Sequence, residues 1–467
     1  MYLDTSLDRF DPAKHYSAVL LQQGRVILDS DVAEQAAIWA HQARTALTDL
    51  IGPYGAPSGN SGFQVSWAAA GSRTDLAISP GRAYVDGILA EVEEPAVTYL
   101  NQPDGYVDPD LDKLPTDGAY VLYLRVWERS VTAVQDPDIR EVALGIHGPD
   151  TAGRARVVWQ VAAWPVRADS PAEALKLWRG DLLTSVRLAR AYQPAGPLQA
   201  QAVPPGDAEL DICSVSPRAQ YRGRENQHYR VEIFGSGVAA PAAGQSGIQG
   251  SQATYVWSRD NGSVVFAIDS LAGAEVTVAS LGRDIPARLE LGDWVEIVDD
   301  ASASHIADDV PAAVRARAVF QVMAIDPLGL VVTLDRDPSR VIGTTGTDPA
   351  RHPLLRRWDG AGAGDAAGAG IPLAEGDWLP LEDGVQVRFP GIADSEGGPA
   401  RYRNGDYWLI PARTVSGDVI WPQEPSGPKA RPPAGVAYHY APLAFIPAGG
   451  DPQQLLPVFS PAAKSPV

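Results

Sequence analysis

The sequence predicts a mainly β protein with an N-terminal helical arm. The chain holds 45 Gly and 40 Pro among its 467 residues, which indicates many turns between short strands. Its apolar runs are of strand length, and one long amphipathic helical pattern stands near the N-terminus. A chain of this length exceeds one ordinary hydrophobic core. We therefore expect two or more β-rich domains, barrel-like or sandwich-like, joined by a helix and a Pro-rich linker.

The arm begins with a short helical pattern. Asp11 is a favourable N-cap, and the proline that follows it suits the first helical position. A helix is therefore predicted over residues 12–22, closed by Gly24 in a left-handed conformation. Such a helix places Tyr16 and Leu20 on one stripe.

A second, longer helix is predicted to follow, from Asp31 to about Ile51. Asp31 starts a D-x-x-E capping signature, and a Gly-Pro pair just beyond Ile51 is a stop signal. Because an isolated helix gains most of its stability by burying its apolar face, this helix needs a partner surface. Its apolar residues recur every three or four positions: Val32, Ala36, Trp39, Ala43, Leu47 and Leu50. We predict that residues 1–60 form a docking arm that makes its contacts through Tyr16, Leu20, Trp39 and Leu47.

The remaining domains are predicted to follow one another along the chain. A Gly/Pro/Ser-rich stretch, residues 54–62, is interpreted as the linker after the arm. Residues 61–168 form a first β domain, with a tight hairpin at Asp86-Gly87. Residues 169–206 form a helix, which starts after Ser170 and is predicted toward Tyr192, and then a Pro-rich linker.

The second half of the chain is again β-rich. Residues 207–446 form this region, with subdomains near 207–345 and 346–446, and residues 447–467 form a Pro-rich tail. Within it, Asn261-Gly262 predicts the turn of a β-hairpin.

Charge and cysteine content restrict the function classes. With 38 Lys+Arg and 57 Asp+Glu the net charge is −19, so we expect neither nucleic-acid binding nor membrane insertion. Cys213 is the only cysteine, which excludes an internal disulfide and a cysteine metal cluster and indicates synthesis in a reducing compartment. The first ten residues have no apolar core, so we expect cytoplasmic synthesis without a signal peptide.

No motif in the sequence indicates catalysis or cofactor binding. The Gly-rich stretch 360–370 lacks the third glycine and the preceding strand of a dinucleotide loop. The seven histidines form no metal motif, and the aspartates of 108–112 are followed by Lys113 where a calcium loop requires glycine. The acidic residues of 299–309 are interpreted as a solvated loop rather than a cation site. We predict no cofactor, no metal and no enzymatic activity.

Twelve tryptophans raise the alternative of a glycan-binding surface, because aromatic faces stack on sugar rings. Most of them stand in strand patterns and are assigned to the core. Arg356, Arg357 and Trp358 are different because they precede the 360–370 loop. We predict that they form a structural clamp on that loop, with a ligand platform as the alternative.

Nine motifs along nearly the whole chain together resemble one family. This family comprises uncharacterised bacterial proteins encoded in the loci of phage-tail-like contractile injection systems. The motifs are FDPAKHYS (10–17), QQGRV (22–26), WSRDNGSVVF (257–266), LGRD (281–284), GDWVE (292–296), HPLLRRW (352–358), LEDGV (381–385), GDYWLIPAR (405–413) and HYAPL (439–443).

The resemblance implies a place in the baseplate or tail-fibre region rather than a reaction. We therefore expect a structural or attachment protein that forms a homo-oligomer, with a trimer favoured by the resemblance. Its expected partners are other baseplate or tail subunits, in a particle released by lysis. The alternative is a carbohydrate-binding receptor for a cell-surface glycan, and a third hypothesis is a cell-envelope glycosidase that uses two of the many carboxylates.

Overall fold

The computed structural model describes residues 1–104, 113–145, 150–182, 196–204, 220–239, 252–282, 284–304, 317–362, 368–391 and 400–460. The chain is mainly β, as predicted, with a long helix near its N-terminus and several sheets. It divides into two compact units, each built from three separate segments. The first unit contains Met1–Leu7, Ser130–Arg154 and Arg190–Val436, and the second contains Asp8–Arg129, Ala155–Ala189 and Ala437–Val467.

This interleaved division differs from the consecutive domains predicted from the sequence. The predicted arm (1–60) is shared, because residues 1–7 belong to the first unit and the residues after them to the second. The predicted first domain (61–168) and the predicted tail (447–467) fall mainly in one unit, although the whole second β-rich region separates them in the sequence. Composition along the chain cannot reveal that the C-terminal residues join the same unit as residues near the N-terminus, because composition reports local structure and not strand pairing.

The second unit is built on two four-stranded sheets, β27-β26-β6-β7 and β28-β1-β4-β5. In the first of these, β6 buries apolar side chains on both of its faces: Val121 and Leu122 are neighbours that point to opposite faces, and both are fully buried. A two-stranded sheet pairs β2 with β3. The strands are β1 (Tyr54–Pro57), β2 (Val65–Trp67), β3 (Leu76–Ile78), β4 (Gly81–Val85), β5 (Ile88–Val92), β6 (Ala119–Val131), β7 (Arg154–Val166), β26 (His439–Ile446), β27 (Gln453–Gln454) and β28 (Val458–Phe459).

The hairpin predicted at Asp86-Gly87 is confirmed. Both residues have positive φ, 48° and 75°, and β4 pairs with β5 directly across them.

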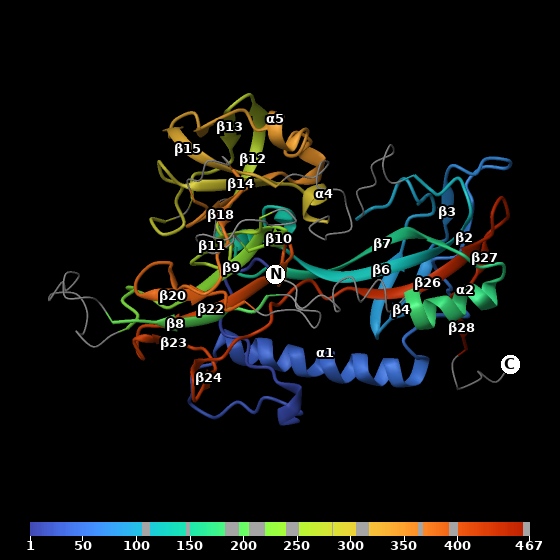
Figure 1. Cartoon of the computed structure of the whole chain (residues 1–467), viewed down its shortest axis with the longest axis horizontal. Helices are drawn as coiled ribbons and strands as arrows, with labels where there is room; N and C mark the ends of the chain where they lie inside the picture. Colours follow the sequence, from blue (N-terminus) through green and yellow to red (C-terminus); the bar gives the residue numbers. More distant parts are fainter. Residues whose placement is uncertain are drawn as a thin grey trace. The chain divides into compact units, whose positions relative to one another are not determined.

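The described residues of the second unit include the α-helices α1 and α2 (Figure 1). The long helix α1 (Asp29–Ile51) begins two residues before the predicted start, and the Asp31 carboxylate accepts a hydrogen bond of 3.2 Å from the Leu28 N–H. The short helix α2 (Pro171–Leu177) is capped by Ser170, as predicted, and continues as a π-helical turn over Trp178–Leu182. The predicted continuation toward Tyr192 lies outside the described residues.

The prediction of a helix over residues 12–22 is wrong. Only a 3-10 helix, η1 (Pro12–Lys14), forms there, and His15 ends it with a left-handed φ of 56°. The Asp11 cap is as predicted, with its side chain accepting from the Ala13 N–H. A short isolated helix is marginal in water unless its apolar face is packed, and Tyr16 and Leu20 are both exposed.

The predicted linker at 54–62 and the predicted C-terminal tail both contribute strands. Strand β1 lies between β4, antiparallel, and β28, parallel, and its Tyr54 and Ala56 are buried. The first part of this stretch, Tyr54–Pro57, therefore forms an internal strand of a sheet rather than a linker. At Gly55 an added Cβ would lie 3.2 Å from the Ile51 side chain.

The first unit contains a five-stranded sheet, β18-β11-β9-β22-β23, and a closed barrel, β12-β13-β16-β15-β14-β17. The barrel core is made of alternate inward residues such as Phe266, Val276, Phe320 and Leu355. The strands are β9 (Gln227–Gly235), β11 (Thr254–Ser258), β12 (Val265–Ala272), β13 (Glu275–Val278), β14 (Trp294–Val298), β15 (Val319–Asp326), β16 (Val331–Leu334), β17 (Leu354–Trp358), β18 (Ile371–Pro372), β22 (Tyr407–Arg413) and β23 (Asp418–Val419).

Smaller elements surround these two sheets in the first unit. A three-stranded sheet has the order β19-β20-β8, and two-stranded sheets pair β10 with β21 and β24 with β25. Their bounds are β8 (Gln199–Ala202), β10 (Gly237–Val238), β19 (Leu379–Pro380), β20 (Val385–Arg388), β21 (Arg401–Tyr402), β24 (Gln423–Glu424) and β25 (Gly427–Pro428). The short helices are η2 (Pro137–Ile139), η3 (Val142–Leu144), α4 (Asp300–Ala303), α5 (Ser339–Ile342) and η5 (Pro349–Arg351).

The turn predicted at Asn261-Gly262 forms, but the hairpin does not. Both residues have positive φ, 54° and 64°. The strands on either side of this turn pair elsewhere: β11 pairs with β9 and β18, whereas β12 pairs with β13 and β17. The turn therefore carries the chain from the five-stranded sheet into the barrel.

Candidate functional site

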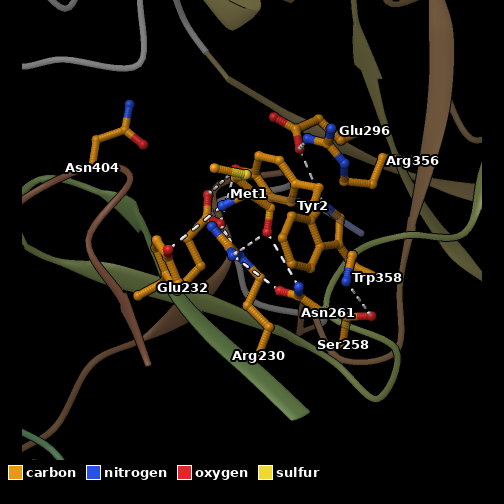
Figure 2. A network of polar contacts seen from close by, with 12 residues as sticks. Met1, Tyr2, Arg230, Glu232, Ser258, Asn261, Glu296, Arg356, Trp358 and Asn404 are labelled. Atoms are coloured by element: carbon orange, nitrogen blue, oxygen red, sulfur yellow. Dashed lines mark hydrogen bonds and ion pairs between the residues drawn. The ribbon is translucent and has the colours of Figure 1, made fainter. Parts of the chain in front are cut away.

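Buried charged residues gather where the five-stranded sheet meets the barrel, and the N-terminal segment reaches them (Figure 2). We call residues 1–7 the N-terminal anchor. We call the group Tyr2, Arg230, Glu232, Glu296, Arg317 and Arg356 the anchor network. All of these residues belong to the first unit.

Tyr2 is the residue through which the anchor enters the network. Its ring lies between two guanidinium groups, with the Cζ atoms of Arg356 and Arg230 at 3.7 and 4.1 Å from the ring centroid. Its hydroxyl donates to the Glu232 carboxylate, whose two oxygens both lie at 2.9 Å. Burial raises the pKa of Tyr2, and the neighbouring Glu232 carboxylate raises it further. The side chain is thus held by both its π faces and its hydroxyl.

Strand β9 supplies Arg230 and Glu232, which share one face because they are two residues apart. Arg230 Nε donates to Glu232 Oε2 at 2.6 Å, and both side chains are almost completely removed from water. Burial alone would raise the pKa of Glu232, but the charges of Arg230 and Arg317 outweigh it and lower this pKa to about 2. Glu232 is therefore an anion in the core, compensated on both sides.

Arg317 joins the sheet to the barrel. Its Nε and Nη2 atoms donate to the two oxygens of Glu296 at 2.6 and 3.1 Å, in the bidentate geometry of a strong ion pair. Its Nη1 donates to Glu232 Oε1 and to Asn404 Oδ1, each at 2.8 Å. Burial opposes the charge of Arg317, yet the two glutamates hold its pKa well above the usual value.

The barrel contributes Glu296 from β14 and Arg356 from β17, which are direct cross-strand neighbours. Arg356 Nη1 lies 3.9 Å from Glu296 Oε2, and Trp358 Nε1 donates to the same oxygen at 3.0 Å. Three guanidinium groups thus surround two carboxylates. Each guanidinium group also contacts a neutral polar side chain or an aromatic ring. Such a network is costly to assemble and more costly to break, because removing one member leaves a buried charge without compensation.

The backbone of the anchor is held as well as its side chain. The Tyr2 N–H donates to Ser130 Oγ at 3.0 Å, and Asn261 Nδ2 donates to the carbonyls of Met1 and Leu3 at 3.2 and 2.8 Å. His228 Nδ1 lies 3.0 Å from the Thr5 carbonyl. The first unit therefore holds the N-terminal anchor through side chains that bind its backbone groups.

The three predicted clamp residues lie on β17 and are buried. Trp358 is 1% exposed and offers no ring face to a glycan or another ligand in this structure. Arg356 is part of the anchor network, and Trp358, on the same face of β17, donates to Glu296 of that network. Arg357, pointing the other way, donates to the carbonyls of Pro286 and Arg288, both at 2.7 Å. The contacts of the clamp thus reach the N-terminal anchor, β14 and the 286–288 turn, which the sequence did not indicate.

A second cluster of titratable side chains lies beside the Asn261-Gly262 turn. Arg259 Nη2 donates to Glu382 Oε2 at 2.9 Å, and Arg259 Nε lies 3.1 Å from Asp359 Oδ1. Burial raises the pKa of Glu382 to about 7, although Arg259 opposes the shift. Burial, with the nearby Asp359 carboxylate, raises the pKa of Asp260 to about 6. These carboxyls titrate near neutral pH, which makes this corner of the fold sensitive to pH.

The predicted docking residues lie mostly in water. Tyr16 is 58% exposed, Leu20 85% and Trp39 64%, whereas Leu47 is half-buried. The buried residues of α1 are instead Ser30 and Ile38. The apolar stripe that the sequence identified is therefore mainly the outer face of the helix.

Metal and membrane signals are absent from the part of the chain that the structure describes. No group of three or more His, Cys, Asp or Glu side chains there is arranged to hold a metal ion. Asp299 is engaged as a helix cap, since it accepts from the Ser302 and Gly346 N–H groups at 2.7 and 3.1 Å. The aspartates at 108, 110, 308 and 309 lie outside the described residues. Among the described helices, none is both long and apolar enough to cross a membrane.

The fold and the anchor network define a β-rich protein whose N-terminus is an integral part of its core. The chain belongs to a family of unknown function, DUF6519, whose model matches residues 1–175 and 173–463. No curated protein matches the chain. No solved structure matches it either.

Sequence reasoning found the motifs that contain several network residues but not the network. Glu296 lies in GDWVE, Arg356 in HPLLRRW and Asn261 in WSRDNGSVVF. Tyr2, Arg230, Glu232 and Arg317 were missed. The available signal was a pair of opposite charges, Arg230 and Glu232, inside an apolar strand pattern, since charged residues are rarely buried unless they are paired.

Proposed function

We propose that this protein is a structural and attachment component of a phage-tail-like contractile injection system, in its baseplate or tail-fibre region. It assembles as a homo-oligomer, with three copies favoured, and docks on neighbouring tail subunits through its N-terminal arm. The resemblance of the nine motifs to proteins of such loci supports the setting. The particle that carries it is released by lysis.

One structural observation carries the assembly role. The stretch from Tyr16 to Leu50 leaves a series of large apolar side chains in water, although the rest of the chain has well-packed cores. Such a concentration on one segment marks an interaction surface. The exposed residues are Tyr16, Leu20, Leu21, Val26, Ile27, Leu28, Val32, Trp39 and Leu50.

The test compares the mass in solution of the full chain with that of Leu20→Gln and Trp39→Ala. Burying one such side chain contributes about 1.5–3 kcal/mol, so each variant should weaken association by roughly 10- to 100-fold. Because both side chains are exposed, the melting temperature of the dissociated chain should stay unchanged. Light scattering over a concentration series measures the first effect and calorimetry the second.

Leu328→Gln is the matched control, since Leu328 is 98% exposed on the turn between β15 and β16. It should leave the mass unchanged. A monomer mass for the unmodified chain at micromolar concentration and physiological salt would count against the proposal.

A further inference from the structure

The N-terminal anchor and the helix α1 are joined by a long segment with little structure of its own. Residues 15–28 form neither helix nor strand in the structure, and the anchor on one side belongs to the first unit and α1 on the other to the second. Fourteen extended residues span on the order of 45 Å. The anchor can therefore reach a site well away from its own α1.

This connecting segment is held by few but defined contacts. The Val19 N–H donates to Gln35 Oε1 at 2.7 Å, and the Arg25 N–H donates to the Gln22 carbonyl at 3.3 Å. Leu20 and Val26 are 85% and 84% exposed, so the arrangement within one copy leaves apolar side chains of the connection in water.

The anchor, in contrast, is bound tightly and specifically. Tyr2 fills a space between two guanidinium groups, and Asn261 and Ser130 bind the backbone on either side of it. A segment with a specific binding site and a long, weakly held connection is the arrangement from which segment exchange between copies arises, because the same contacts form in either copy.

We propose that the copies of this protein assemble by exchange of the N-terminal anchor: residues 1–7 of one copy fill the anchor network of a second copy, and residues 15–28 cross between them. The inference rests on the proposed function, since it specifies how the homo-oligomer is made. It commits to a second copy of this chain as the occupant of the site.

Disulfide trapping tests the exchange directly. An added Cβ at Gly153 would lie 2.5 and 2.9 Å from the two Cδ atoms of Leu3, so Leu3→Cys and Gly153→Cys place two thiols together once the leucine is removed. Both changes are made in a Cys213→Ser background, because Cys213 is the only native cysteine. Copies with Leu3→Cys and one affinity tag are co-expressed with copies that carry Gly153→Cys and another tag, and the assembled fraction is oxidised.

We expect a disulfide between the two differently tagged copies. Leu3→Cys paired with Val415→Cys is the control for random collision, since Val415 is 99% exposed on a surface turn; it should give no such product. A chain that carries both Leu3→Cys and Gly153→Cys shows that the thiols can react. If that chain closes only on itself while the tagged copies stay unlinked, the anchor stays in its own copy and the exchange is overturned, although an oligomer would leave the proposed function standing.

A second measurement decides the case in which no thiol reacts. Tyr2→Ala removes the ring and Tyr2→Phe keeps it, so under exchange Tyr2→Ala should dissociate the oligomer and Tyr2→Phe should retain most of it. If Tyr2→Ala lowers the melting temperature but leaves the oligomer mass unchanged, the anchor acts within one copy and the exchange is overturned. A monomer in every variant and in the unmodified chain overturns the exchange and counts against the proposed function as well.

Discussion

At the scale of single residues, the first unit is distinguished by charges placed in its interior. Arg230, Glu232, Glu296 and Arg356 are buried in strands that otherwise consist mainly of apolar residues. Pairing offsets the free-energy cost of burying these charges, since each carboxylate accepts from more than one guanidinium or ring N–H group. The stability of the unit therefore depends on the complete set.

We predict that Glu232→Gln destabilises the protein by about 3–5 kcal/mol, because Arg230 and Arg317 lose the anion that compensates them both. Chemical denaturation measures the change. Glu424→Gln is the control: Glu424 pairs with Lys429 at 3.7 Å on the surface, and its loss should change stability by no more than about 1 kcal/mol. Equal effects of the two changes would contradict this account of the anchor network.

The lowered pKa of Glu232 also leads us to predict a loss of stability in acid. Its pKa is lowered to about 2 in the folded state from an ordinary value of 4.5. Its stabilising contribution is therefore present above pH 4.5 and is lost as the pH falls toward 2.

For Glu382 we predict a pH dependence of stability with the opposite sign. Its pKa is raised from 4.5 to about 7, so its contribution is fully present below pH 4.5 and is lost as the pH rises through 7. Glu382→Gln has no such loss, and we expect the melting temperature of this variant, relative to the unmodified protein, to rise between pH 5 and pH 8. Asp260 titrates in both proteins and cancels in the comparison. A difference that stays constant between these pH values would show that Glu382 is not held neutral by the fold.

At the scale of elements, the turn at Asn261-Gly262 connects the five-stranded sheet, the barrel and the N-terminal anchor. It leads from β11 into β12, and an added Cβ at Gly262 would lie 2.9 Å from Tyr2 Cδ1. The backbone of Gly262 is also in the left-handed region, with φ +64°. A side chain here therefore meets both backbone strain and a steric contact.

We predict that Gly262→Ala destabilises the protein more than Gly273→Ala. Gly273 has a similar φ of +61°, but an added Cβ there meets nothing within 4 Å, so its change should cost only the backbone strain, about 1–2 kcal/mol. The excess for Gly262→Ala measures the displacement of Tyr2. If thermal denaturation gives the two variants the same stability, the anchor does not pack on this turn.

At the scale of the whole molecule, the chain passes repeatedly between its two units. A docking arm of the kind predicted from the sequence would be removable, so that residues 63–467 would fold without it. The structure argues for a different outcome, because this truncation removes Tyr2 from the anchor network and β1 from between β4 and β28. Loss of an internal strand exposes two edges and the core behind them.

We therefore expect a chain of residues 63–467 to lose its cooperative melting transition, while residues 8–467, which lack only the N-terminal anchor, melt cooperatively at a lowered temperature. Circular dichroism on heating, compared with the full chain, measures both. If residues 63–467 melt like the full chain, the arm is removable and this expectation is wrong.

The sequence by itself determined the features that depend on local chemistry. The period of apolar residues and the Gly-Pro stop placed α1, which runs over Asp29–Ile51, and Asp86-Gly87 placed the β4–β5 hairpin. Apolar runs of strand length indicated many short buried strands, because apolar patterns reflect burial directly. The mainly β class followed from the same signals.

Only the tertiary structure decided what depends on contacts between distant residues. The anchor network brings Tyr2 to Glu232 and Arg317 to both glutamates, and no local spacing in the sequence encodes those meetings. The face of α1 that is buried, the entry of residues 54–57 into a sheet and the failure of the 12–22 helix have the same origin. A local pattern fixes which backbone conformations are favourable, but the free energy of burial is realised only against the surface that the rest of the fold provides.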